Sequence, residues 1–209
     1  MKDGEQNKQS FITVARREQI IEAAIKTLDE IGYVKASLAQ IAKRAGISTA
    51  LISYHFADKN DLMNHLLWTL LEKSKSSILE RVHRGNTPQE KLNTFIVASL
   101  EYQSTQPAHH TALIEIIFHA RTADNIPYYK LSDEDEDPML KELQQILQNG
   151  QDDGVFSDYF NVDVMANMIQ GAIGEYMFNS NLIKKVDLKT YSTELINIVN
   201  KACVSSYIR

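Results

Sequence analysis

Apolar residues recur at helical spacing along most of this sequence, and residues that interrupt helices are scarce. The 209 residues include only four prolines and eight glycines. Side chains three or four positions apart lie on the same face of a helix, so such stripes predict amphipathic helices that pack together. We therefore predict an all-α protein of about nine helices.

The first clear stripe starts at Arg16 and runs through Ile20, Ile21, Ala24, Ile25, Leu28 and Ile31. Gly32 is expected to end this helix, because glycine adopts positive φ without strain. Residues 1–12 are polar and without helical period, so they are predicted to form a flexible tail. Asp58 is expected to cap a helix that starts at Lys59, and Pro88 follows Thr87 at another helix start. Further helices are expected to begin at Pro107 and at Pro138, the second of these ending near Asn149-Gly150, and the last two to span 162–179 and 188–209.

The bulk composition excludes several classes of protein. Hydrophobic residues make up 44% and charged residues 23%, as is usual for a globular protein with a core. Cys203 is the single cysteine, so an intramolecular disulfide and a cysteine-based zinc site are excluded. We find no secretory signal and no apolar run long enough to span a membrane, so a cytoplasmic protein is expected.

The charges are unevenly distributed along the chain. The net charge is −5, from 22 basic and 27 acidic residues. Residues 1–60 hold nine Lys or Arg and seven Asp or Glu, a balance of +2, which leaves −7 for the remainder. A basic amino end permits nucleic-acid binding without requiring it.

Two short helical patterns flank a glycine near the amino end. Ser37 and Gln40 form a capping-box pattern before the first, which is expected to end at Ala45-Gly46. Ser48 is expected to cap the second. Two short helices around a tight glycine turn make a helix-turn-helix, which leaves residues 48–55 facing outward to enter a major groove. A simple helical hairpin inside a core has the same pattern, so the residues that follow matter.

The segment at 37–62, SLAQIAKRAGISTALISYHFADKNDL, resembles the tetracycline-repressor (TetR) family of bacterial regulators. The resemblance implies a three-helix DNA-binding head and a helical ligand-binding and dimerisation domain. It also implies an operator of palindromic double-stranded DNA and release by a small-molecule effector. We place the head at residues 13–60 and the second domain at residues 61–209.

The resemblance also implies DNA contacts. The residues concerned are Ser37, Ser48, Thr49, Ala50, Leu51, Ser53, Tyr54, His55 and Lys59. Ser37, His55 and Lys59 match positions at which the family contacts phosphates, and the start of the second short helix reads bases. The family often has glycine at position 50 and tyrosine at position 53, where this chain has Ala50 and Ser53, with the tyrosine one position later.

The helix expected at 162–178 is apolar or small almost all round, which predicts burial on both sides. A homodimer formed by the last two helices is therefore expected, in line with the resemblance. Candidate ligand contacts in the second domain are Trp68, Phe95, Tyr102, Glu115, Phe118, His119, Met168 and Tyr176. Each of these is also the kind of residue that simply packs in a core.

No cofactor or metal is expected. Glu115 and His119 lie four residues apart but lack a third ligand of defined spacing, and the acidic run at 133–137 departs from a calcium loop. Catalytic motifs are missing, so we expect no enzyme. The sequence favours a ligand-released repressor. A regulator of the same fold controlled by a partner protein, and a helical interaction protein with a degenerate head, remain alternatives.

Overall fold

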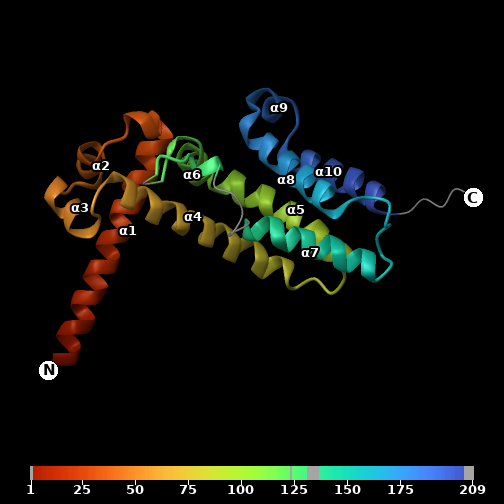
Figure 1. The fold of residues 1–209 in the computed structure, drawn as a ribbon, viewed down its shortest axis with the longest axis horizontal. Helices are drawn as coiled ribbons and strands as arrows, with labels where there is room; N and C mark the ends of the chain where they lie inside the picture. Colours follow the sequence, from red (N-terminus) through yellow and green to blue (C-terminus); the bar gives the residue numbers. More distant parts are fainter. Residues whose placement is uncertain (1, 123, 131–136, 205–209) are drawn as a thin grey trace, which may run out of the picture. The chain divides into compact units, whose positions relative to one another are not determined.

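A computed structural model describes residues 2–122, 124–130 and 137–204, with side chains from residue 11 onward. These residues form ten α-helices and one 3₁₀ turn (Figure 1). The helices are α1 (Lys2–Lys35), α2 (Leu38–Ala45), α3 (Thr49–His55), α4 (Lys59–Val82), α5 (Pro88–Thr105), α6 (Pro107–His119), α7 (Pro138–Asp152), α8 (Val162–Phe178), α9 (Ser180–Lys185) and α10 (Leu188–Cys203), and the turn is η1 (Tyr128–Lys130). The predicted all-α fold is confirmed.

Most predicted helix starts coincide with caps that the structure contains. Asp58 Oδ1 accepts a hydrogen bond from the Asp61 amide at 2.8 Å, and Thr87 Oγ1 accepts one from the Glu90 amide at 3.1 Å. Asp137 does the same for the amide of Met139. Such side-chain oxygens satisfy amides that have no partner within the first turn of a helix. The rest of the acidic loop, residues 131–136, lies outside the described residues.

Three helix ends and one additional helix differ from the prediction. Helix α10 ends at Cys203, before the predicted end at residue 209. Helix α1 begins at Lys2, so it includes the segment for which the sequence predicts a flexible tail. That segment is rich in Lys, Glu and Gln, which favour helix even without an apolar stripe. The sequence predicts that the helix beginning at Pro138 ends near Gly150, but α7 continues to Asp152. The short helix α9 was not predicted.

Gly150 remains inside α7 because a neighbouring ring occupies the space a side chain would need. A β-carbon at Gly150 would collide with the ring of Phe156. The backbone turns back immediately after the helix, and the amides of Val155 and Phe156 both donate to the Gly150 carbonyl, at 2.9 and 2.8 Å. This glycine therefore serves close packing, which sequence pattern alone does not distinguish from a helix end.

The chain folds into two compact units. Unit 1 comprises residues 1–71 and 108–131, and unit 2 comprises residues 72–107 and 132–209. Helix α4 contributes residues to both units. These units do not coincide with the domains predicted from the sequence, which divide the chain by expected function at residue 60. That functional division stays a prediction.

Unit 1 has a core built from five helices. Its fully buried members include Ile20, Ala24 and Leu28 of α1, Ile41 of α2, Ile52 of α3, Leu62, Met63 and Leu66 of α4, and Ala112 and Ile116 of α6. Phe56, which follows α3, is 1% exposed and belongs to the same core. The short helices α2 and α3 are thus held by longer helices on several sides.

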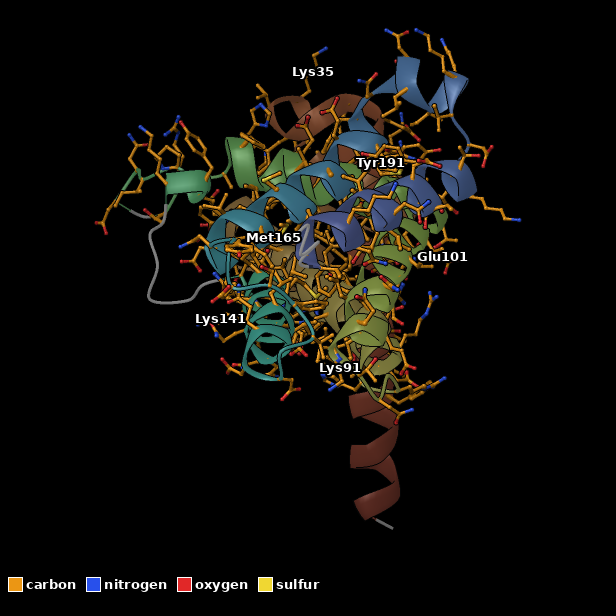
Figure 2. All side chains as sticks on the ribbon, turned by 90° about the vertical axis from the view of Figure 1, so that its right-hand side faces the viewer. Lys35, Lys91, Glu101, Lys141, Met165 and Tyr191 are labelled. Atoms are coloured by element: carbon orange, nitrogen blue, oxygen red, sulfur yellow. The ribbon has the colours of Figure 1, made fainter. Side chains whose placement is uncertain are left out.

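Unit 2 is a helical bundle with a separate core. Its buried residues come from the end of α4 and from α5, α7, α8 and α10, and include Val82, Leu92, Ile96, Leu147, Ile169 and Val199. Glu101 and Lys141, labelled in Figure 2, are exposed, whereas Met165 is 7% exposed and belongs to this core. The Tyr191 hydroxyl of α10 donates to the Ala172 carbonyl of α8 at 2.7 Å, which fixes these two helices side by side.

Candidate nucleic-acid interface

The start of α2 is fixed by the predicted cap. Ser37 has an extended backbone, and its Oγ accepts from the Gln40 amide at 3.3 Å. Gln40 reaches back as expected, but its Oε1 accepts from the Ser37 hydroxyl at 2.9 Å. The hydroxyl is therefore used in both directions. The N-terminal end of α2, with its partial positive charge, stays at the surface.

The turn between α2 and α3 depends on Gly46. Its φ and ψ are 67° and 31°, the left-handed conformation, and the Ile47 amide donates to the Ala42 carbonyl at 3.0 Å. A β-carbon at Gly46 would meet nothing within 4 Å, so glycine is needed here for its backbone and not for space. Ala42 is 2% exposed, which confirms that the turn brings this position into the core.

Helix α3 presents one buried residue inward and most of its side chains outward. Ser48 Oγ caps it by accepting from the Leu51 amide at 3.2 Å. Ile52 is fully buried, and Phe56 ends the helix inside the core. The outward side chains are Thr49, Ala50, Ser53 and Tyr54, with Leu51 and His55 half-buried. A helix seven residues long thus has its whole outer face open to a partner.

Lys59, for which the sequence predicts a phosphate contact, is engaged within unit 1. Its Nζ donates to the Tyr33 carbonyl at 2.7 Å and lies 4.1 Å from the centre of the Tyr33 ring. Burial lowers the pKa of the Lys59 ammonium. The side chain therefore joins the start of α4 to the end of α1, and a phosphate would have to compete for it.

Glu115, which the sequence analysis predicts as a ligand contact, also contacts Tyr33, as Lys59 does. Its Oε2 accepts from the Tyr33 amide at 2.7 Å, and it lies 3.4 Å from His119 Nδ1. The approach requires Gly32, whose φ is 72° and whose added β-carbon would lie 3.2 Å from Glu115 Oε2. The rings of His119 and Tyr33 are stacked, with centroids 6.3 Å apart. Helix α6 thus anchors the junction between α1 and α2.

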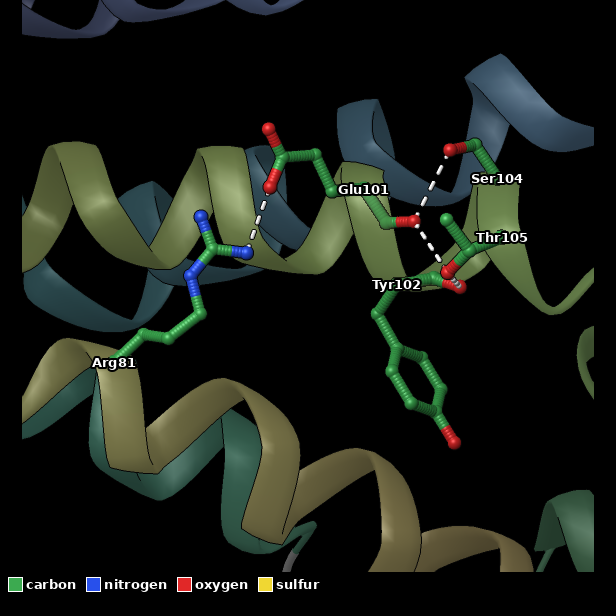
Figure 3. Close-up of polar contacts among 5 residues, drawn as sticks. All are labelled: Arg81, Glu101, Tyr102, Ser104 and Thr105. Atoms are coloured by element: carbon green, nitrogen blue, oxygen red, sulfur yellow. Dashed lines mark hydrogen bonds and ion pairs between the residues drawn. The ribbon is translucent and has the colours of Figure 1, made fainter.

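The other predicted ligand contacts are dispersed. Trp68, Phe118 and Met168 are mostly exposed, whereas Phe95 and Tyr176 are buried in the core of unit 2. The Tyr176 hydroxyl donates to the Val186 carbonyl at 3.0 Å. Tyr102 is half-buried on α5, where burial raises the pKa of its hydroxyl. Figure 3 shows its ring directed away from the Glu101 carboxylate, whose Oε2 accepts from Arg81 Nη1 at 2.7 Å.

Two hollows are described in unit 2. One, of about 300 Å³, is lined by Asn86, Pro88, Lys91, Ile146, Asn149, Asp152 and Asp153. The other, of about 670 Å³, is an open groove along the glutamines of α7 and the start of α8. None of the eight predicted ligand contacts lines either hollow. These eight residues therefore stay a prediction.

The sequence analysis did not predict three residues that lie near α3 and the end of α2. Gln19 Nε2 donates to the Ala45 carbonyl at 2.6 Å, at the end of α2. Arg17 Nη1 donates to the His55 carbonyl at 3.4 Å, and its guanidinium lies 4.6 Å from the centre of the Phe56 ring. Arg16 precedes it. The sequence signal that could have pointed to the two arginines is their position as an Arg-Arg pair shortly before Ile20, the first buried residue described in α1.

The pKa of His55 reflects these neighbours. Burial is the main cause that lowers the pKa of the His55 imidazole, and the positive charges of Arg17 and Arg16 lower that pKa further. The His55 and Tyr54 rings are nearly perpendicular to one another, with centroids 5.1 Å apart. His55 is therefore a neutral hydrogen-bonding group at pH 7 beside two fixed positive charges.

Comparison with known proteins identifies the amino-terminal part of this arrangement. The sequence profile described as "Bacterial regulatory proteins, tetR family" matches residues 20–66. The tetR match includes α2, the Gly46 turn, α3 and the start of α4, so it confirms the resemblance predicted from residues 37–62.

Curated proteins similar to this chain include HTH-type transcriptional regulators. The chain is 29% identical over 131 residues to the HTH-type transcriptional regulator BetI of Escherichia coli O45:K1 (strain S88 / ExPEC), covering 63% of this chain and 61% of that protein. It is 37% identical over 82 residues to BetI of Stenotrophomonas maltophilia (strain R551-3), covering 39% of this chain and 42% of that protein. The match to the E. coli relative thus spans less than two thirds of its length.

Solved structures extend the likeness of fold beyond the tetR-family head. The fatty acid degradation regulator FadR from Bacillus halodurans matches with a TM-score of 0.74 at 20% identity, over 93% of this chain and 96% of that one. FadR from Bacillus subtilis in complex with stearoyl-CoA matches with a TM-score of 0.75 at 22% identity, over 88% of this chain and 98% of that one.

Membrane-spanning helices and metal-binding clusters are both missing from the described residues. No helix among them combines the length and apolar character needed to cross a membrane. In the same part of the chain, no three or more His, Cys, Asp or Glu side chains gather as a metal site would require.

Proposed function

We propose that this chain is a homodimeric, cytoplasmic transcriptional regulator that binds a palindromic DNA operator and is released from it by a small molecule. The observation that carries the proposal is the outward face of α3, exposed beside a complete core and matched to the tetR family. The fold fits a repressor that acts by occupying DNA, and no enzymatic activity is included in the proposal.

The chemistry of α3 suits reading bases in a major groove. Thr49 offers a hydroxyl and a methyl group, and Leu51 and Ala50 offer apolar contact to a thymine methyl. Ser37 and Ser48 lie at helix starts, where backbone amides favour phosphate oxygens. We infer that the phosphate contacts position α3 and that Thr49 and Leu51 specify sequence.

The dimer is proposed from a stripe of apolar side chains on unit 2. On α8, Val164 and Met168 are 58% and 64% exposed, and on α10 Ile198 is 63% exposed. Added β-carbons at Gly171 and Gly174 would meet nothing within 4 Å, so a second helix could approach α8 closely. A second copy of the chain would cover this stripe by two-fold symmetry and pair two heads for a palindrome.

The small-molecule effector is proposed from the solved relatives. FadR from Bacillus subtilis, which shares the fold, is described in complex with stearoyl-CoA. An effector lowers DNA affinity only if it binds the DNA-free state more tightly than the DNA-bound state. We place this site in the region after residue 60 and use stearoyl-CoA as the first compound to test.

Selection of bound duplexes from randomised DNA, at near-physiological salt, tests the proposal directly. Recovery of a two-fold symmetric motif would support a dimeric, sequence-reading regulator. Recovery of nothing above background, from folded and dimeric protein, would contradict it and favour an interaction protein with a degenerate head. If a partner protein released the selected duplex and no tested small molecule did, the proposed small-molecule effector would be rejected.

A further inference from the structure

Four glutamine side chains line the open groove of about 670 Å³ on unit 2. All four belong to α7, and they are Gln144, Gln145, Gln148 and Gln151. The rest of the lining comes from Lys141 and from residues 160–163 at the start of α8. Residues three or four positions apart lie on the same face of a helix, so these side-chain amides follow one another along α7.

Gln151 is held by two hydrogen bonds. Its Nε2 donates to the carbonyls of Ser157 and Phe160, at 2.9 and 3.0 Å, in the connection between α7 and α8. A side-chain amide has two N–H donors on its nitrogen and two lone pairs on its oxygen. Both donors of Gln151 are therefore engaged within the protein, which fixes its Oε1 in place as a hydrogen-bond acceptor.

Gln144 and Gln148 are oriented by carboxylates. Gln144 Nε2 donates to Asp163 Oδ1 at 3.0 Å, and Gln148 Nε2 donates to Asp152 Oδ1 at 2.9 Å. Within the part of the chain that the structure describes, no donor is bonded to the Oε1 atom of either glutamine or of Gln151. The groove thus offers a series of acceptor oxygens, two of them on amides bonded to carboxylates.

These acceptors favour a cation as the ligand. An ammonium group has only donors, so its hydrogen bonds match a surface of acceptor oxygens, and bonds with a charged partner are the stronger ones. Residues 61–209 hold 13 Lys or Arg and 20 Asp or Glu, a balance of −7, which attracts cations to this part of the molecule. A phosphate or carboxylate ligand would instead be repelled by Asp152 and Asp163.

The acceptors form a row and do not converge on one point. Gln144, Gln148 and Gln151 are four and then three residues apart, which corresponds to about 6 Å and then about 4.5 Å along the helix axis. A metal ion needs ligands that surround it, and no cluster of three His, Cys, Asp or Glu side chains occurs among the described residues. Separated acceptors suit a chain with several ammonium groups. Spermidine is such a chain, with an aminobutyl arm and a shorter aminopropyl arm.

The groove also has apolar surface for the carbon chain of such a ligand. Phe160 and Val162 line it, and both are half-buried. Methylene groups can pack on these side chains, and the face of an aromatic ring attracts an ammonium group. Lys141, labelled in Figure 2, is the one cation among the lining residues, and its charge opposes binding at the end of the groove next to Gln144.

We propose that this groove, called here the glutamine groove, binds a linear aliphatic polyamine of the spermidine class. The ammonium groups donate to the glutamine Oε1 atoms and to Asp163, and the carbon chain packs against Phe160. The site is separate from the eight predicted ligand contacts. It requires no DNA, so the proposal goes beyond the regulator proposed above.

Titration of spermidine against the whole, DNA-free chain tests the glutamine groove. Spermidine should shift the NMR signals of the side-chain amides of Gln144, Gln148 and Gln151, and calorimetry gives the affinity. Putrescine, which lacks the aminopropyl arm, should bind more weakly. Magnesium chloride, a cation without a carbon chain, and trehalose, a neutral polyol, should leave these signals unchanged.

Three variants separate the groove from the general charge of the surface. Gln148→Met nearly keeps the side-chain length but removes the acceptor, so it should weaken spermidine binding about five-fold. Gln106→Met makes the same change at an exposed position of α5 and should bind as the wild type does. Lys141→Gln removes the cation from the groove and should bind spermidine more tightly, a gain that damage to the fold would not produce. Circular-dichroism melts establish that each variant is folded.

Two results would overturn the glutamine groove. Equal affinity of the wild type and Gln148→Met would show that spermidine is held only by the negative charge of the surface. Shifts caused by trehalose but not by spermidine would show that the groove takes neutral polyols instead. Both readouts are made without DNA, so failure of the groove and failure of the proposed regulator are distinguished.

Discussion

The pair of short helices α2 and α3 and the helical bundle of unit 2 are determined by different features of the sequence. Helices α2 and α3 have eight and seven residues, and each is fixed at its ends by a named cap. Helices α5, α7, α8 and α10 are about twice as long and are held by apolar stripes. Short helices are marginal alone, so their ends must be specified locally.

Their exposed faces differ in the same way. The outward face of α3 carries hydroxyls, an amphipathic tyrosine and nearby arginines, whereas α8 and α10 expose Val164, Met168 and Ile198. Polar and cationic groups suit phosphates and base edges, and a bare apolar stripe suits another protein surface. The part proposed to bind DNA is recognisable from its sequence because local geometry restricts which residues can form its caps and its turn.

The largest effect is expected from deleting core volume in either region. Ile52 and Leu147 are both 0% exposed, so Ile52→Ala and Leu147→Ala should each reduce the free energy of unfolding by about 2–5 kcal/mol in urea titrations. Below the unfolding temperature, only Ile52→Ala should lose preference for the operator, because Ile52 seats α3. Equal loss of preference in both variants would break the distinction between the regions.

A charge on the apolar stripe should dissociate the proposed dimer. Met168→Lys places an ammonium on an exposed position of α8 and should weaken dimerisation by about 2 kcal/mol or more, if the stripe is the interface. Gln145→Lys adds the same charge at an exposed position of α7, outside the stripe, and should have little effect. Sedimentation equilibrium distinguishes them, and an unchanged dimer in Met168→Lys would place the interface elsewhere.

Substitutions at Gly46 and at Gly150 should have smaller effects on stability, and they should distinguish the two positions sharply. Gly46→Ala should lose about 1–2 kcal/mol of stability from left-handed backbone strain, and Gly46→Asn should lose less, because asparagine tolerates that conformation. Gly150→Ala and Gly150→Asn should both be destabilising, the second more so, since the Phe156 ring fills the space. Thermal melts of the four variants would reveal whether asparagine rescues only position 46.

Loss of the Glu115 carboxylate should have an effect of about 1 kcal/mol on stability, because the buried Tyr33 amide loses its acceptor. Glu115→Gln retains an acceptor oxygen and should resemble the wild type, whereas Glu115→Ala should not. We expect Glu115→Ala to lower DNA affinity on all sequences alike, as α6 releases the junction of α1 and α2. A changed sequence preference would contradict this role.

Acidification should produce the mildest change. The pKa values of His55, His65 and His110 in unit 1 are lowered from the ordinary histidine pKa of 6.5, in each case mainly by burial. Because the unfolded chain binds protons more readily than the folded one, stability is complete well above pH 6.5 and is lost as the pH falls below it. Thermal melts should give the same melting temperature at pH 8 and pH 7.5 and a lower one at pH 5.5. A higher melting temperature at pH 5.5 would contradict this direction.

Much of the head could be predicted from its sequence, and the reasons are local. Ser37, Ser48 and Asp58 cap helices as predicted, and Gly46 adopts the predicted left-handed turn. In each case one side chain or one φ angle satisfies groups within four residues. The inference therefore needed no knowledge of how distant segments meet.

The misses involve contacts that the sequence pattern did not reveal, some local and some between distant segments. Gly150 looked like a helix end until the Phe156 ring was seen to pack on it. Asn179 was predicted to end a helix, but it also caps α9 by accepting from the Leu182 amide at 3.0 Å. The position of Arg17 beside His55 depends on how α1 crosses α3, and the predicted set of ligand contacts depended on where long helices meet.

The composition of unit 1 has a practical consequence for protein engineering. Leu62, Met63 and Leu66, from beyond residue 60, and Ala112 and Ile116, from α6, complete the core that seats α2 and α3. A fragment ended at residue 60 would expose the apolar undersides of both short helices and aggregate. Chimeras that transplant α2 and α3 from this chain would have to exchange two separated segments of sequence together, since the core that seats these helices is assembled from non-contiguous parts.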